Sequence, residues 1–255
     1  MGQQKTDIVL VLGSGPNVLA AQDWPKTWFD RIVVINNAWQ VRPDWDDLVY
    51  PEDFPSDRMP PDIRTKQKLI DAAAFVPAQN SFGGFVYAGG TMAFTSAYWA
   101  LHAHKPRVMA FLGCDMMYPS QGKTHFYGRG TADPLRNDIT LRDLGAKSAR
   151  LAAIANQQGC ACVNLSSEPS ALLFPRANAA ELRGLNVKID LETEDYRHLR
   201  QREDDLGYVT PDGRYWEDST LFDEKKLAAL DLDWRDFYTS AVRNLSGLAG
   251  VGESR

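Results

Sequence analysis

The apolar run from Arg107 to Leu112 (RVMAFL) is the feature that most constrains the fold of this chain. Lys105-Pro106 precedes the run and Gly113-Cys114-Asp115 ends it, so the run has the length of a strand rather than of a helix. All five residues after Arg107 are apolar, which is typical of a strand buried on both faces of a parallel sheet. The sequence therefore predicts a central buried strand that ends at Asp115.

Four further short apolar runs predict strands, at residues 7–12, 31–35, 47–50 and 161–165. The segments between them predict helices at about 92–104 and 141–158, a short helix at 62–74 and a brief strand at 74–76. This alternation predicts a Rossmann-like α/β fold, with a mostly parallel sheet and helices on both faces. Because ligands of open α/β sheets bind beyond the carboxyl ends of strands, we expect the site around Asp115 and the long polar loop that follows it.

The character of the chain changes after about residue 185. Residues 1–185 carry 18 basic and 17 acidic side chains, whereas residues 186–255 carry 10 and 16. Residues 208–216 predict a hairpin around a Pro-Asp-Gly turn, and the spacing of Trp234, Phe237, Ala241 and Leu245 predicts a last helix. We expect a Rossmann-like domain at 1–185 and a small acidic C-terminal appendage at 186–255, packed on that domain or on a second subunit of a homo-oligomer.

Composition argues against several classes of protein. The net charge of −5 gives no basic face, so we expect no nucleic-acid partner. No apolar run reaches the roughly 20 residues of a membrane span, so we expect no transmembrane segment. The three cysteines, Cys114, Cys160 and Cys162, form no disulfide framework and indicate a reducing, cytoplasmic compartment. The Cys160-x-Cys162 pair has no second Cys or His cluster to complete a zinc site.

Residues 13–17 (GSGPN) follow the first predicted strand and open the next segment. A dinucleotide fingerprint would need a third glycine where Val18 stands, and an acidic residue where the second strand ends in Asn36-Asn37. Both departures argue against NAD. A mononucleotide at this turn, with asparagine side chains bound to its sugar or base, and a tight turn without a ligand both remain open.

The position of other polar residues relative to the predicted strands indicates which of them can reach a ligand. Asp44-x-Asp46 has a metal-binding spacing but precedes its strand, so we interpret it as a loop. His102-x-His104 stands near a helix C-terminus, where histidines complement the helix dipole. Asp53 and Ser170 follow the strands at 47–50 and 161–165, so we expect both at the ligand edge.

Three segments together resemble a known group of enzymes: GSGPN after the first strand, VINNA at the second, and GCDMMY…GKTHFYG after the central strand. They resemble the bacterial sialyltransferases of glycosyltransferase family 42. They also resemble the related motility-accessory-factor flagellin glycosyltransferases and archaeal 6-hydroxymethylpterin diphosphokinases. The resemblance covers roughly residues 6–176, up to the segment SALLFPR. It implies a nucleotide bound through Gly13–Asn17 and Asn36, with the second substrate under the 116–140 loop.

In the sialyltransferases, a histidine in an H-Y-I-G-H-type segment of this loop is the general base, and tyrosines bind the leaving phosphate. This chain reads His125-Phe126-Tyr127-Gly128-Arg129, so Arg129 occupies the base position. A guanidinium cannot accept a proton, which leaves His125 as the candidate base. Arg129, Tyr118 and Tyr127 would then stabilise the departing phosphate.

The resemblance implies a sialyltransferase-like glycosyltransferase that takes a nucleotide-activated sugar, with a CMP-sugar favoured, and needs no other cofactor. A glycan or surface-polymer precursor would be the acceptor. One alternative is an ATP-dependent diphosphokinase acting on a small molecule, with Mg²⁺ held by Asp115 and Asp53; another is a nucleotide-binding module without turnover. The candidate catalytic residues are His125, Asp115 and Arg129, and the candidate binding residues are Gly13, Ser14, Gly15, Pro16, Asn17, Asn36, Asn37, Asp53, Gly90, Thr91, Tyr118, Lys123, Tyr127 and Ser170.

Overall fold

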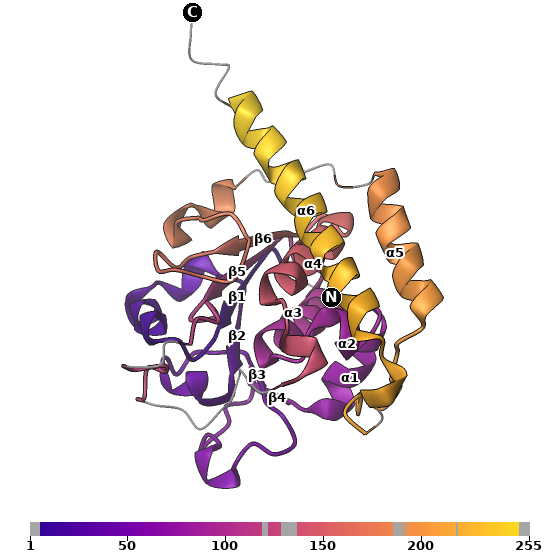
Figure 1. Cartoon of the computed structure of the whole chain (residues 1–255). Helices are drawn as coiled ribbons and strands as arrows, with labels where there is room; N and C mark the ends of the chain where they lie inside the picture. The colour runs from indigo at the N-terminus through magenta and orange to yellow at the C-terminus, as the bar shows by residue number, and fades with distance from the viewer. Residues whose placement is uncertain are drawn as a thin grey trace, which may run out of the picture.

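The computed structural model describes residues 6–118, 122–128, 137–185, 191, 193–217 and 219–249 of the chain. Its centre is one six-stranded sheet in which every neighbouring pair of strands is parallel. The strands are β1 (Ile8–Leu12), β2 (Arg31–Ile35), β3 (Asp47–Val49), β4 (Lys68–Ile70), β5 (Val108–Leu112) and β6 (Ala161–Asn164). The predicted Rossmann-like α/β fold is confirmed (Figure 1).

The strand order is β4-β3-β2-β1-β5-β6. From β1 the chain moves outward through β2, β3 and β4, and it then returns to the other side of β1 to add β5 and β6. The order therefore reverses between β1 and β5. In doubly wound sheets the crevice at this switch point, outside the carboxyl ends of the strands, is where ligands bind.

The two faces of the sheet are covered by different kinds of helix. Val9 and Val11 of β1 face one apolar cluster, which includes residues of the α-helices α1 (Ala72–Asn80), α3 (Met92–His104), α4 (Leu144–Gln157) and α6 (Glu224–Ala249). Ile8, Leu10 and Leu12 face the other cluster, which is covered by the 3₁₀ helices η1 (Pro16–Asp23), η3 (Asn36–Gln40) and η6 (Ala179–Gly184). Strands β1, β2 and β5 are therefore buried on both faces, as their apolar runs predict.

The local prediction for residues 62–76 is wrong. No helix spans 62–74; instead β4 pairs with β3 at residues 68–70, and α1 begins after Asp71. The Asp71 side chain accepts a hydrogen bond from the backbone N–H of Ala73 at 3.1 Å, which caps the helix. The expected strand at 74–76 lies within α1, while β4 escaped prediction because two of its three side chains are exposed.

The predicted hairpin at 208–216 is also wrong, although its turn is present. The backbone N–H of Gly213 donates to the carbonyl of Thr210 at 2.9 Å, but the flanking residues form no strands. Their aromatic rings pack on the short helix α2 (Phe85–Ala88) instead: Tyr208 stacks on Tyr87 and Tyr215 on Phe85, with ring centroids 6.2 and 6.1 Å apart.

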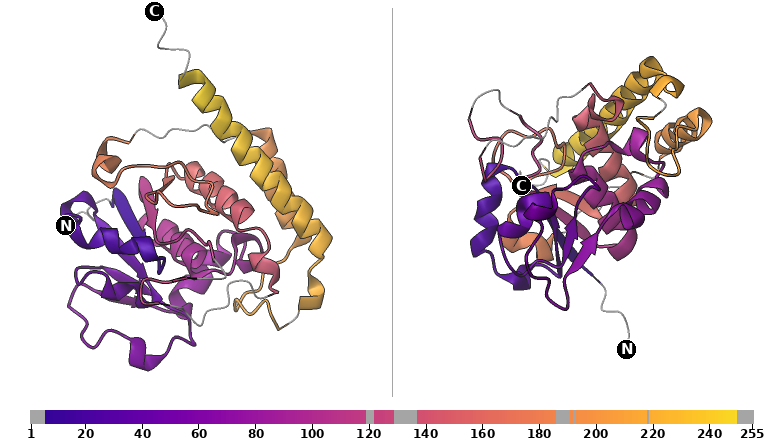
Figure 2. Two further views of the ribbon diagram at one scale, coloured as in Figure 1. Left: turned by 60° about the vertical axis from the view of Figure 1, so that its left-hand side comes forward. Right: turned by 90° about the horizontal axis from the view of Figure 1, so that it is seen from below.

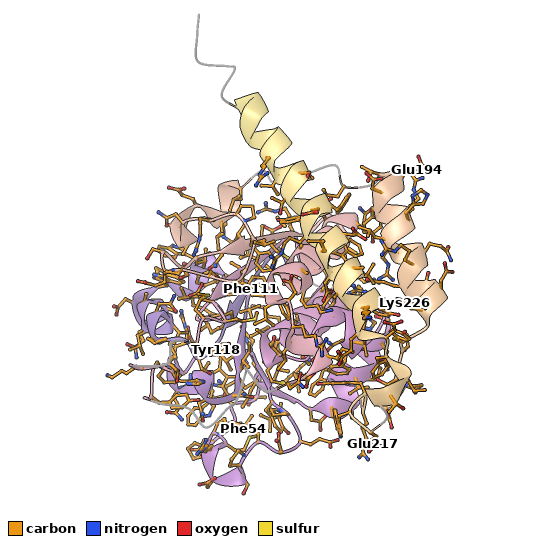
Figure 3. All side chains as sticks on the ribbon, in the orientation of Figure 1. Phe54, Phe111, Tyr118, Glu194, Glu217 and Lys226 are labelled. Atoms are coloured by element: carbon orange, nitrogen blue, oxygen red, sulfur yellow. The ribbon has the colours of Figure 1, made fainter. Side chains whose placement is uncertain are left out.

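The helices of the C-terminal segment pack on the sheet domain through α4. Helix α6 lies along α4, and α5 (Glu194–Leu206) lies beside α6, while the last turns of α6 project beyond the body (Figures 1 and 2). Trp234 is 1% exposed, in agreement with the expectation that this aromatic residue needs burial. Figure 3 shows the dense packing of side chains around Phe111 in the centre of the molecule.

Buried charges join these three helices. Arg150 on α4 forms an ion pair with Glu203 on α5 at 2.6 Å, and the indole N–H of Trp234 donates to the same carboxylate at 2.8 Å. Lys147, one turn before Arg150, pairs with Asp231 on α6 at 2.8 Å. All four charged groups are at least 90% buried, so each one depends on its partner.

Candidate functional site

The loops after β1 and β5 touch at the switch point. The N–H of Gly15 donates to the carbonyl of Gly113 at 2.8 Å, and the N–H of Gly13 donates to the carbonyl of Leu112 at 2.9 Å. A Cβ on Gly13 would lie only 2.3 Å from the Gly113 oxygen, and Gly113 itself has a positive φ of 71°. The close approach of these two backbones explains the glycines. Neither the Gly13 nor the Gly15 N–H is therefore spare for a phosphate.

Asp115 lies just beyond Gly113 and is held by two side-chain amides. Asn17 Nδ2 donates to Asp115 Oδ2 at 2.7 Å, and Asn164 Nδ2 donates to Asp115 Oδ1 at 3.2 Å. Two of the serines after β6 extend the cluster: Asn17 Nδ2 also donates to Ser166 Oγ at 2.7 Å, and Asn164 Nδ2 to Ser170 Oγ at 3.0 Å. The carboxyl ends of β1, β5 and β6 thus form one polar cluster around a carboxylate, here called the edge cluster.

Sequence reasoning missed Asn164 and Ser166. Asn164 is 1% exposed and Ser166 is 4% exposed, so both are as buried as core residues. An available signal was the amide residue Asn164, which closes an otherwise apolar strand. Buried polar side chains need partners, and these residues find theirs in each other and in Asp115.

Two asparagines at this edge have a buried side-chain oxygen to which no described residue donates. Asn17 Oδ1 and Asn36 Oδ1 accept no hydrogen bond from any of the residues that the structure describes. Asn36 opens η3 directly after β2 with a φ of 51°, a left-handed conformation that asparagine tolerates. Backbone geometry therefore accounts for an asparagine at position 36 but not for its orphan oxygen. Asn37, beside it, is buried.

Residues 122–128 lie against the β1 turn. The N–H of Phe126 donates to the carbonyl of Ser14 at 2.9 Å, and His125 and Gly128 exchange two backbone hydrogen bonds. The predicted base His125 therefore stands one residue from a contact with the GSGPN turn. Partial burial lowers the pKa of His125 below its ordinary value, so the ring is neutral at pH 7. Thr124 Oγ1 lies 2.9 Å from His125 Nδ1.

The other predicted residues of this loop differ in exposure. The Tyr127 ring lies 5.0 Å from the His125 ring and is 42% exposed, and Lys123 is also exposed. Tyr118 is half-buried at the edge of the core (Figure 3), and burial raises its pKa to about 12. The phenol therefore keeps its proton and can donate a hydrogen bond. Arg129 lies outside the described residues.

The helix start at Gly90-Thr91 is occupied by contacts within the protein. The Thr91 side chain caps α3 by accepting from the Phe94 N–H at 3.3 Å. A Cβ on Gly90 would lie 2.4 Å from Thr140 Oγ1 and 2.8 Å from the Tyr215 hydroxyl, so this glycine makes room for a side chain of the C-terminal segment. The remaining predicted residue of the β1 turn, Pro16, is exposed and begins η1.

The structure does not bring Asp53 to the edge cluster. Asp53 is exposed on the loop after β3, next to Phe54, which lies far from Phe111 in Figure 3. Strand β3 is three strand spacings from β5, or roughly 14 Å. Within the described ranges, no three histidine, cysteine or acidic side chains gather as metal ligands. The three cysteines are buried free thiols.

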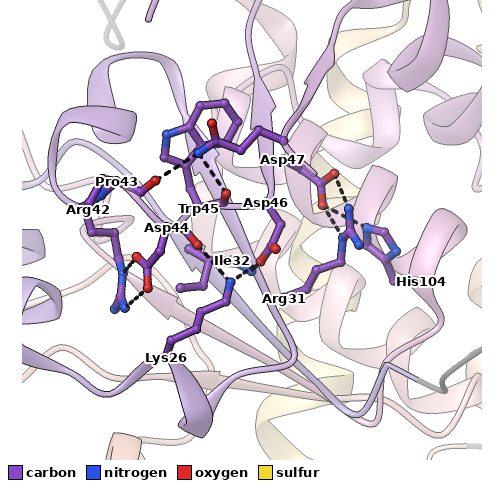
Figure 4. Close-up of polar contacts among 11 residues, drawn as sticks. Lys26, Arg31, Ile32, Arg42, Pro43, Asp44, Trp45, Asp46, Asp47 and His104 are labelled. Carbon is purple, nitrogen blue, oxygen red and sulfur yellow. Dashed lines mark hydrogen bonds and ion pairs between the residues drawn. The ribbon is translucent and has the colours of Figure 1, made fainter. Parts of the chain in front are cut away.

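The opposite, amino edge of the sheet holds a separate set of ion pairs (Figure 4). Asp44 pairs with Arg42 and Asp46 with Lys26, so the D-x-D motif serves internal contacts. His104 Nε2 lies 3.2 Å from Asp47 Oδ2, which also accepts from Arg31. His104 therefore does more than complement the helix dipole. Burial opposes ionisation of Asp47, but Arg31 and His104 outweigh it and lower the pKa of the carboxyl.

A surface groove of about 340 Å³ lies at this amino edge, lined by Pro43, Asp44, Trp45, Asp46, Arg64, Thr65, Lys66 and Gln67. It is at the end of the sheet opposite to the edge cluster. Over the residues described, no helix has both the length and the hydropathy of a membrane span. No protein-family model, curated protein or solved structure matches the chain.

Proposed function

We propose that this chain is a nucleotide-sugar glycosyltransferase of the sialyltransferase-like kind, which takes a CMP-activated sugar and acts in the cytoplasm on a glycan or surface-polymer precursor. The observation that carries the proposal is the pair of orphan oxygens, Asn17 Oδ1 and Asn36 Oδ1, which follow the adjacent strands β1 and β2 at the carboxyl edge of the sheet. A buried carbonyl oxygen without a donor costs about 1–3 kcal/mol, which a ligand hydroxyl or amino group would offset. A ribose and a cytosine base carry such donors.

Sugar transfer needs a general base that takes the proton from the hydroxyl group of the acceptor substrate. His125 is the candidate, because its lowered pKa leaves an imidazole nitrogen without a proton at neutral pH. Its segment also contacts the β1 turn, so the base would stand next to the bound nucleotide. Tyr118, as a neutral phenol, would donate to the departing phosphate, together with Tyr127 and Arg129.

The edge cluster would bind rather than react. Asp115 accepts two amide hydrogen bonds and is 9% exposed, an arrangement that holds a carboxylate in place toward hydroxyl donors. A shared Mg²⁺ between Asp115 and Asp53 would need the two carboxylates within about 5 Å of each other. The three strand spacings between β3 and β5 give the diphosphokinase alternative no support.

A thermal-shift screen against CMP, CDP, UDP, GDP and ATP, each with and without Mg²⁺, tests the proposal. Stabilisation by CMP without metal is the expected result, followed by transfer or hydrolysis of a CMP-sugar. Stabilisation by ATP only with Mg²⁺ would replace it with the diphosphokinase alternative. Binding of a nucleotide with no turnover of any donor would replace it with a binding module.

A further inference from the structure

Arg176 follows β6 at the outer side of the edge cluster. The backbone around it continues the sheet: the Asn164 N–H donates to the Pro175 carbonyl at 2.8 Å, and the Ala177 N–H donates to the Asn164 carbonyl at 3.1 Å. A parallel bridge thereby pairs Arg176 with Asn164, a member of the edge cluster. Pairing with the sheet, and not a surface loop, therefore fixes the backbone position of Arg176.

Two carbonyls then hold the guanidinium. Arg176 Nη1 donates to the carbonyl of Ser166, and Nη2 donates to the carbonyl of Glu168 at 2.7 Å. Three of the five N–H donors remain, and no carboxylate among the described residues pairs with the charge. The residue is exposed, so the remaining donors can reach a ligand.

Ser166 links this cation to the edge cluster. Its carbonyl accepts from Arg176, while its hydroxyl accepts from Asn17 Nδ2, which also binds Asp115. Asp115 in turn is bound by amides only and has no cation partner in the described part of the chain. The Asp115 carboxylate and the Arg176 guanidinium therefore lie at the same edge of the sheet. They do not pair with each other, and neutral groups among the described residues hold each of them.

We propose that Arg176 binds an oxyanion of the ligand, while Asn17 and Asp115 accept from its hydroxyl or amino groups. The inference rests on the proposed function and refines its donor: the oxyanion is the nucleotide phosphate or a carboxylate on the transferred sugar. A guanidinium matches both anions through paired N–H donors. The two carbonyl contacts hold it in place beforehand, so little side-chain entropy is lost on binding.

The test compares the binding of three probes, cytidine, CMP and CMP-N-acetylneuraminate, by calorimetry in the parent and in Arg176→Gln. We expect the parent to prefer CMP over cytidine, or the CMP-sugar over CMP, and the variant to lose about 10- to 100-fold of that preference. If the variant loses the preference for CMP over cytidine, Arg176 binds the phosphate. If it loses the preference for the CMP-sugar over CMP, Arg176 binds the carboxylate. Arg176→Lys keeps the positive charge but lacks the paired N–H donors, so its preference should lie between those of the parent and of Arg176→Gln.

Arg183→Gln is the matched control. Arg183 is also exposed and also donates to a backbone carbonyl, that of Thr27, but it pairs with Asp30. If Arg176→Gln keeps both preferences of the parent, the inference is overturned while the proposed function stands. If the parent binds none of the three probes, the proposed function is overturned, and the anion site is then tested with inorganic phosphate alone. A phosphate-dependent rise in Tm that Arg176→Gln lacks supports the site. Equal responses of the parent and the variant overturn it.

Discussion

Gly13 and Gly113 show how a single missing Cβ shapes the site. Gly13→Ala would place a methyl 2.3 Å from the Gly113 oxygen, so the two loops must separate. We expect a loss of about 2–3 kcal/mol in the free energy of unfolding, measured by urea denaturation. Gly184→Ala is the control, because its Cβ meets nothing within 4 Å and it should change stability by less than about 0.5 kcal/mol. Equal effects of the two variants would contradict this account of the β1 turn.

His125 is the residue on which the proposed chemistry depends. His125→Ala should lower the rate of sugar transfer by ~10²–10⁴ with little change in donor affinity, because the base acts on the acceptor. Burial lowers the pKa of His125 below 6.5, so the active neutral form is lost only as pH falls below that value. The ratio kcat/KM should stay level from pH 7.5 to about 6.5 and decline at lower pH. A decline that begins above pH 7, or full activity in the alanine variant, would rule out this role.

Individual site residues could be predicted where they follow a recognisable strand. Asp115, Asn17 and Ser170 were expected at the edge and lie together there. Asn164 was missed because it belongs to the strand itself, where position along the chain does not indicate which side chain turns toward a neighbour. The glycines were expected to make room for a phosphate; the room is filled by a second loop, a contact between residues 100 positions apart.

At the scale of elements, the long apolar strands could be predicted and the short polar ones could not. Strands β1, β2 and β5 are buried on both faces, and their five-residue runs, which lack polar alternation, indicate this burial. Strand β4 has one buried side chain in three, so its sequence carries no such pattern. Residues 208–216 have the sequence pattern of a hairpin because Tyr208 and Tyr215 pack on α2, whereas a hairpin would pack them in a sheet.

The junction of α4, α5 and α6 depends on Glu203. Its carboxylate accepts from Arg150, Arg200 and Trp234, and it is 2% exposed. Glu203→Ala leaves the Arg150 charge buried and unpaired, so we expect a loss of about 3–5 kcal/mol in urea denaturation.

Asp233→Ala is the matched control for Glu203→Ala. Asp233 also pairs with an arginine of α5, Arg202, but both partners of this pair are nearly half exposed. Its loss should cost at most about 1 kcal/mol. Comparable losses from the two substitutions would show that burial of the Glu203 carboxylate does not matter to the junction.

At the scale of the whole molecule, the C-terminal helices complete the core. A chain ending at Leu185 would expose the apolar surface under Trp234 and deprive Lys147 and Arg150 of their partners Asp231 and Glu203. We expect this truncated chain to aggregate or to unfold at least about 10 °C below the parent. A truncated chain that is monomeric and equally stable in scanning calorimetry would contradict this packing.

We propose that a nucleotide binds at the carboxyl ends of β1 and β2 through Asn17 and Asn36. Calorimetric titration of CMP without metal tests it directly, in the parent, in Asn17→Ala and in Asn36→Ala. We expect the parent to bind CMP and each variant to lose about 10-fold in affinity. Asn178→Ala, which removes only the cap of η6, should bind like the parent. A parent that does not bind CMP, or two site variants that bind it as tightly as the parent, would contradict the claim.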